Sequence, residues 1–158
     1  MKHILLTLAI LLTLMGCTNK EKKFTPTGPK VRAVVKFVEE GAELIREEGI
    51  AAFDKFRSDE TWLREDKYIF VWGMDGMRYV YPPDPAGEGK IMLDLVDDDE
   101  TPIGLQFVKI AQQSGGWVHY RWPKPGDTKP VWKSTYILPV KAPNGSEYLI
   151  GSGVYGIK

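Results

Sequence analysis

The chain has 158 residues, and its 21 lysine and arginine side chains balance its 21 aspartate and glutamate side chains. Because the net charge is zero and no basic block stands out, nucleic acid is excluded as a predicted partner. The single cysteine excludes an intramolecular disulfide, so the folded part must depend on an ordinary hydrophobic core.

The N-terminal residues are typical of a lipoprotein signal peptide. A short positive region precedes an apolar run from Ile4 to Leu14, and the small residue Gly16 stands directly before Cys17. A membrane-spanning helix needs about 20 apolar residues, so this run is too short to cross a bilayer. We therefore expect residues 1–16 to be a signal peptide and Cys17 to carry the lipid anchor. The alternative is an uncleaved core helix with a free thiol.

A polar segment with two prolines and a glycine follows from Thr18 to Pro29 and is typical of a tether. We expect residues 17–29 to connect the membrane to one domain over residues 30–158. Thr18, rather than aspartate, after the cysteine favours the outer membrane where a cell has two membranes. The predicted location is therefore the periplasmic face of the cell envelope.

An amphipathic helix is predicted from Lys30, because apolar side chains recur at spacings of three and four residues. Gly49 interrupts the pattern, and a second helical segment is predicted to end near Arg57. The apolar stripe fits either a helix that faces the core or a surface that binds a partner.

Two strands and a short helix are predicted next. The residues Tyr68–Trp72 are large and apolar at both parities, which favours a central strand covered on both faces, and a turn leads into a returning strand at Arg78–Tyr81. Thr101, followed by proline, predicts a helix start with a capping hydroxyl. The acidic run at 97–100 is interpreted as a solvated loop, because it lacks the glycine and the downstream glutamate of a calcium loop.

Three antiparallel strands are predicted in the last third of the chain. The segments Gly115–Gly126, Lys133–Tyr136 and Gly151–Tyr155 combine β-branched and aromatic residues, with turn residues between them. Tyrosine, tryptophan and lysine on adjacent strands offer a small anion both apolar walls and a cationic partner.

In this order, the segments closely resemble the single Cache domain of the second type, an extracytoplasmic sensor module of bacterial chemoreceptors and histidine kinases. The most specific match is the Tyr-x-Trp-x-Lys-Pro-Gly pattern of Tyr120–Gly126 with the Lys133–Tyr136 strand, and the resemblance covers Lys30–Ile157. It implies an α+β, PAS-like Cache fold: a five-stranded antiparallel sheet, a long N-terminal helix, a short crossing helix and a ligand pocket. The chain has Tyr81-Pro82 where the family usually shows histidine-proline.

Six side chains are predicted to bind the ligand: Trp72, Tyr79, Tyr120, Trp122, Lys133 and Tyr136. Burial of an ammonium group without an anion is costly, so Lys133 either faces inward and binds a carboxylate or points outward as an exposed lysine. Each aromatic side chain fits a core position equally well. Tyr136 shares a face with Lys133 only if a bulge intervenes, because residues three apart on a strand face opposite sides. Arg121 is expected to face solvent.

No enzymatic activity, metal site or cofactor is predicted, because no serine or cysteine has the context of a nucleophile and only His119 remains after processing. The resemblance implies a lipid-anchored sensor domain for a small organic acid, with a carboxylate as the expected ligand. Because the chain ends after the domain, we expect it to act through a membrane receptor, kinase or transporter. The alternative is a ligand-free structural lipoprotein that docks a membrane partner through the Lys30–Arg57 helix.

Overall fold

The computed structural model describes residues 25–157, so the predicted signal peptide and Cys17 lie outside the described residues. The elements in chain order are α1 (Pro29–Glu48), the 3₁₀ turn η1 (Gly49–Ala51), α2 (Ala52–Ser58), β1 (Leu63–Arg64), β2 (Lys67–Tyr68), β3 (Phe70–Gly73), β4 (Arg78–Val80), η2 (Pro85–Gly87), α3 (Ile103–Gln112), β5 (Gly116–Trp122), β6 (Val131–Lys141) and β7 (Glu147–Tyr155). Within residues 25–157, the structure contains no helix with the length and apolar character needed to cross a membrane.

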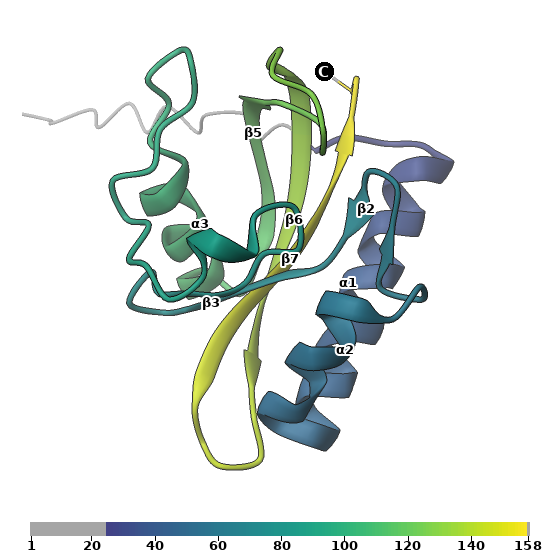
Figure 1. Cartoon of the computed structure of the whole chain (residues 1–158), viewed down its shortest axis with the longest axis vertical. Helices are drawn as coiled ribbons and strands as arrows, with labels where there is room; N and C mark the ends of the chain where they lie inside the picture. The colour runs from purple at the N-terminus through teal and green to yellow at the C-terminus, as the bar shows by residue number, and fades with distance from the viewer. Residues whose placement is uncertain (1–24, 158) are drawn as a thin grey trace, which may run out of the picture.

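A central antiparallel sheet separates two layers of helix. Its strand order is β4-β3-β7-β6-β5, and β1 and β2 form a separate small hairpin. In Figure 1, α1 and α2 cover one face of the sheet, whereas α3 and the long segment before it cover the other. The predicted α+β fold, with a long N-terminal helix, a five-stranded antiparallel sheet and a short crossing helix, is confirmed.

The first half of the chain forms its helices largely as predicted. Pro29 occupies the first turn of α1, where its missing N–H needs no partner. The helix ends at Glu48, because Gly49 takes a φ of 64°, a left-handed conformation that favours glycine. The apolar stripe of α1 includes Val34, Val38 and Ile45, and it packs on the sheet rather than facing solvent.

The alternation of side chains from Tyr68, at the end of β2, through β3 divides the interior into two clusters. Ile69 and Val71 face α1 and α2, whereas Tyr68, Phe70 and Trp72 face α3. Residues on both faces are buried, which agrees with the predicted covered strand. The cluster on the α1 side is mainly aliphatic and phenylalanine, but the cluster on the α3 side is rich in tyrosine and tryptophan. The two faces therefore offer different chemistry.

The start of α3 differs from the sequence prediction. The helix begins at Ile103, and no side-chain hydroxyl caps it. Instead, the carboxylate of Asp97 accepts hydrogen bonds from the backbone N–H groups of Asp99, Thr101 and Arg121. Asp97 is buried, so the interpretation of the whole acidic run as a solvated loop was wrong for this residue. The Asp97 carboxylate fixes the loop against β5. Beside it, Arg121 Nε lies 2.9 Å from Asp98 Oδ1.

Gly104 lets the first turn of α3 lie directly against the preceding loop. A Cβ atom at this position would overlap the backbone oxygens of Met92 and Leu93. We expect Gly104→Ala to lower the free energy of unfolding by about 1–3 kcal/mol, because backbone atoms cannot move aside as a flexible side chain can. Leu105→Ala, on the exposed side of the same helix, should change it by less than about 0.5 kcal/mol. Thermal unfolding of the two variants checks this, and equal stability of both would contradict the close approach.

Candidate ligand-binding site

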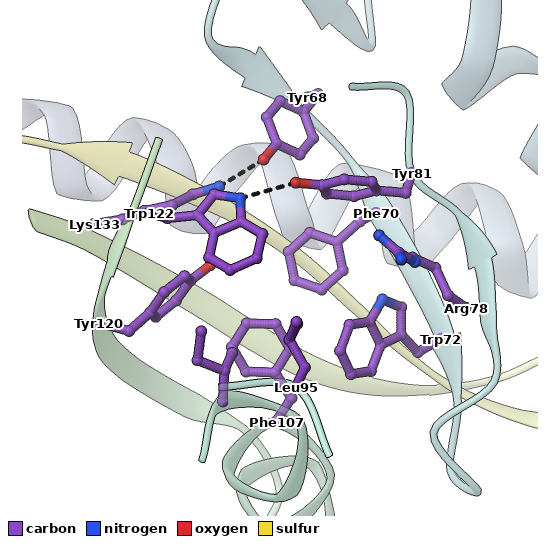
Figure 2. Close-up of a pocket in the computed structure, with 11 residues that line it drawn as sticks. Tyr68, Phe70, Trp72, Arg78, Tyr81, Leu95, Phe107, Tyr120, Trp122 and Lys133 are labelled. Carbon is purple, nitrogen blue, oxygen red and sulfur yellow. Dashed lines mark hydrogen bonds between the residues drawn. The ribbon is translucent and has the colours of Figure 1, made fainter. Parts of the chain in front are cut away.

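An inner cavity lies between the α3 face of the sheet and the segments that cross it. Figure 2 shows its lining, which consists of Tyr68, Phe70, Trp72, Arg78, Tyr81, Leu95, Ile103, Phe107, Tyr120, Trp122 and Lys133. The lining is largely aromatic, and its ionisable groups include two cations but no aspartate or glutamate. The free volume is about 20 Å³, which is room for about one water molecule.

Lys133 is the central polar group of this cavity. Its side chain is 1% exposed, and its Nζ atom donates a hydrogen bond to Tyr68 Oη at 2.7 Å. The same atom lies 4.6 Å from the centroid of the Tyr68 ring and 4.8 Å from that of Tyr155. Such contacts with aromatic faces stabilise an ammonium group. Lys133 makes no ion pair with any residue from 25 to 157.

Burial lowers the pKa of Lys133 to about 7, and the negative charge of Asp66 acts in the opposite direction. Asp66 makes no ion pair with Lys133. Its Oδ2 atom instead lies 3.5 Å from Lys124 Nζ near the surface. Burial also raises the pKa values of Tyr68 and Tyr155, so these hydroxyls stay neutral and cannot serve as counter-ions. The cavity thus holds a cationic group that has neutral partners only.

The space for the lysine side chain comes from a glycine on the next strand. Lys133 on β6 lies opposite Tyr155 on β7, and Gly153 faces Thr135. A Cβ atom on Gly153 would overlap Cε of Lys133 and would lie 2.7 Å from Thr135 Oγ1. Because Gly153 has no side chain, the long side chain of Lys133 can lie buried along β7.

Two residues that line both the inner cavity and its larger neighbour are hydrogen-bonded to each other. Trp122 Nε1 donates to Tyr81 Oη at 2.9 Å, as the dashed line between these two residues in Figure 2 marks. Beyond this pair lies an outer cavity of about 300 Å³, lined mainly by the segments around Pro83 and around Pro125. The two cavities share lining residues: Tyr68, Arg78, Tyr81, Leu95 and Trp122.

The structure brings four of the six predicted site residues together. Trp72, Tyr120, Trp122 and Lys133 line the inner cavity, and Tyr120 Oη is hydrogen-bonded to Thr135 Oγ1 at 2.9 Å. Lys133 faces inward, as one of its two predicted orientations required.

Tyr79 and Tyr136 lie outside the cavity, on the face of the sheet that α1 and α2 cover. Tyr79 contacts the rings of Phe53 and Tyr148, and Tyr136 packs against Trp117. The β5–β6–β7 register runs without a bulge at Tyr136, so this residue keeps the parity opposite to Lys133.

A bulge in the β3–β4 hairpin explains the position of Tyr79. Val71 pairs with Val80, but Trp72 pairs with Arg78, so Tyr79 is the extra residue of β4. The bulge directs Arg78, which the sequence analysis did not select, to the cavity in place of Tyr79. The strand pattern alone contains no signal for this shift, because only the pairing register reveals it.

Two tyrosines of the cavity were also missed. Tyr68 and Tyr81 supply hydroxyl groups to the cavity, so the tyrosine that replaces the family's usual histidine keeps a polar group at its edge. Arg121 lies at the surface with 30% of its side chain exposed, and its Nε donates to Asp98 Oδ1 at 2.9 Å. Among residues 25–157, no cluster of three or more histidine, cysteine, aspartate or glutamate side chains is arranged to hold a metal ion.

Comparisons with known proteins agree with this architecture. A sequence model of the Cache domain matches residues 39–156. The methyl-accepting chemotaxis protein McpP of Pseudomonas putida is 36% identical over 91 residues, which are 57% of this chain and 16% of the receptor. This chain therefore spans less than a fifth of that relative's length.

Solved structures share the fold. The periplasmic sensor domain of a chemotaxis protein is 27% identical, with a TM-score of 0.61 over 79% of this chain and 89% of that one. A Cache chemosensory domain described for its recognition of carboxylic acid is 22% identical, with a TM-score of 0.67 over 80% and 93% of the two chains. A methyl-accepting chemotaxis protein from Vibrio parahaemolyticus is 18% identical, with a TM-score of 0.66 over 80% and 88%.

The buried lysine predicts an unusual dependence of stability on pH. In the unfolded chain the pKa of lysine is about 10.4, whereas in the folded protein that of Lys133 is about 7. Between about pH 7 and pH 10, Lys133 holds its proton in the unfolded chain but not in the folded protein. Its contribution to the free energy of unfolding therefore rises as pH rises through this range. Below about pH 7 the full penalty of burying the charge is present.

We therefore expect Lys133→Met to raise the Tm of the ligand-free protein near pH 6, and the difference from wild type to narrow towards pH 9. Loss of the hydrogen bond to Tyr68 opposes this gain, but by only about 1 kcal/mol. Lys141→Met, an exposed position on the same strand, is the control and should change Tm little at either pH. A lower Tm for Lys133→Met at pH 6 would show that the ammonium group stabilises the free protein.

Proposed function

The chain belongs to the Cache domain family, and on that premise we propose that it is an extracytoplasmic sensor domain that binds a small carboxylate at Lys133. The observation that carries the proposal is a buried cation without a carboxylate partner, enclosed by aromatic side chains. A buried charge normally has a counter-ion, and a ligand carboxylate supplies one. The solved Cache domain described for carboxylic acid recognition supports the same ligand class.

Binding of such a ligand requires a change in the cavity. A free volume of about 20 Å³ does not hold even a two-carbon acid. The Trp122–Tyr81 pair stands between the inner and outer cavities, so opening this hydrogen bond is the most direct route to Lys133. We propose that the ligand stabilises the open form, because only that form allows contact with the ammonium group.

Replacement of Lys133 tests the ligand class. A charge-assisted hydrogen bond contributes about 1.5–3 kcal/mol, so Lys133→Ala should weaken binding roughly tenfold to a hundredfold without loss of the fold. Calorimetry with acetate, propionate, lactate and pyruvate on the full chain measures this, with Lys141→Ala as the matched control. In the ligand-free protein, Lys133 loses its proton above about pH 7. The affinity of the wild type for a carboxylate should therefore fall as pH rises past that value.

Two results would contradict the proposal. Unchanged affinity in Lys133→Ala would show that the ligand binds elsewhere. No binding by any carboxylate would favour the second candidate, a ligand-free scaffold that docks a membrane partner. The small volume of the inner cavity is also compatible with that function.

We further propose that the domain is attached to the membrane by a lipid on Cys17, on the strength of the apolar run and the small residue that precede this cysteine. Cys17→Ser should release the protein from the membrane fraction, because no acyl chain can then be attached. Its unfolding temperature should stay unchanged, since the described fold begins with α1 at Pro29. Thr18→Ser keeps the cysteine and is the control. Fractionation followed by immunoblotting decides, and retention of Cys17→Ser in the membrane would refute the lipid anchor.

A further inference from the structure

Arg78 is a second buried cation in the same cavity, and it also has no carboxylate partner. Its side chain is 7% exposed, and it makes no ion pair with residues 25–157. Its Nη2 atom donates only to the sulfur of Met92, at 3.1 Å, and sulfur is a weak acceptor. Its Nε atom is buried without a hydrogen bond. A guanidinium group stays charged, so these donors lack an acceptor of matching strength.

Trp72 adds a second donor without a hydrogen-bond partner, beside Nε of Arg78. The two residues are direct partners across the β3–β4 ladder, and both side chains line the inner cavity. Nε1 of Trp72 is buried and has no hydrogen-bond partner. An indole nitrogen only donates, as a guanidinium does. The position therefore gathers donors from two neighbouring strands, and the sulfur of Met92 is the only acceptor that residues 25–157 offer their side chains.

This group of donors lies away from Lys133. Figure 2 shows Lys133 and Arg78 on opposite sides of the cavity, with the rings of Phe70 and Tyr81 between them. The face of the Tyr81 ring lies 4.7 Å from the guanidinium carbon, so the ring helps to hold Arg78 in place. The cavity thus has two separated cationic ends and an aromatic middle.

A count of charges distinguishes ligands with one acidic group from those with two. The inner lining carries Lys133 and Arg78 and no acid. Asp84 lies near Arg78 on the outer side, since a Cβ atom on Gly87 would be 2.5 Å from Asp84 Oδ2 and 2.7 Å from Arg78 Nη2, but the two side chains make no ion pair. Within the inner cavity, a ligand with one carboxylate neutralises one cation and leaves the other without a paired acid, which is unfavourable. A ligand with a carboxylate at each end neutralises both. The outer cavity is different, because there Asp84 and Asp127 accompany Arg78 and Lys124.

We infer that Arg78 and Trp72 form a second anion-binding end of the site, so that the ligand is a short dicarboxylate held between Arg78 and Lys133. This inference rests on the proposed function, since it concerns the same cavity. Arg78 is then the residue that determines specificity for the second acidic group, and the bulge at Tyr79 is what brings it there.

A pair of ligands of equal length tests this directly. Succinate and its monoamide, succinamate, differ by one acidic group and are nearly identical in shape. We expect the full-length wild-type protein to bind succinate roughly tenfold or more tightly than succinamate in calorimetry near neutral pH. Arg78→Met should reduce this preference to about one while leaving the affinity for succinamate nearly unchanged. Arg46→Met, an exposed arginine on α1, removes the same charge elsewhere and should retain the preference.

The outcomes separate this inference from the function on which it rests. Equal affinity of the wild type for the two ligands, or an unchanged preference in Arg78→Met, overturns the dicarboxylate assignment, whereas a loss of binding in Lys133→Ala would still support a carboxylate sensor. If no carboxylate binds the wild type at all, both proposals fail. Should Arg78→Met not fold, Arg78→Lys keeps the charge but loses the planar fork, and the wild-type preference alone still decides.

Discussion

The burial of the Lys133 ammonium group among neutral aromatic side chains is the constraint on which the rest of the site depends. A lysine in such a position is unfavourable unless its charge is matched, and the protein provides only a tyrosine hydroxyl and two ring faces. The lowered pKa expresses this imbalance. In the proposed function a ligand carboxylate supplies the missing counter-ion, and the stability of the free protein is then linked to ligand binding.

The two faces of the sheet differ in what they bury. On one face, α1 and α2 bury a dry apolar cluster that includes Phe56 and Ile150, and this cluster supplies hydrophobic stabilisation. The other face carries the cavity with its unmatched donors, covered by α3 and the loop that Asp97 fixes to β5. A strained electrostatic arrangement on one side can persist because the opposite side packs well.

Small local features decide where the polar groups of the site lie. Gly153 leaves room for the lysine chain, and Gly104 brings the loop before α3 close to the helix. The bulge in the β3–β4 hairpin exchanges Tyr79 for Arg78 at the cavity wall. The hydrogen bond between Trp122 and Tyr81 joins two residues that line both the inner and the outer cavity. Each feature involves only one or two residues, and together they shape a cavity that Lys133 and Arg78 both line.

The sequence by itself determined the helices, the strand order along the chain and the resemblance to Cache domains, because these depend on periodicity, turn residues and short motifs. It also made Lys133 a candidate, since a lysine within an apolar strand stands out, but the inward orientation was favoured only by the resemblance and the exposed orientation stayed open. Only the tertiary structure decided which face of the sheet each aromatic residue occupies, and so moved Tyr79 and Tyr136 away from the cavity and brought Arg78 into it. The physical reason is that a one-residue shift in strand pairing exchanges the two faces of a sheet, and pairing depends on contacts between segments distant in the chain.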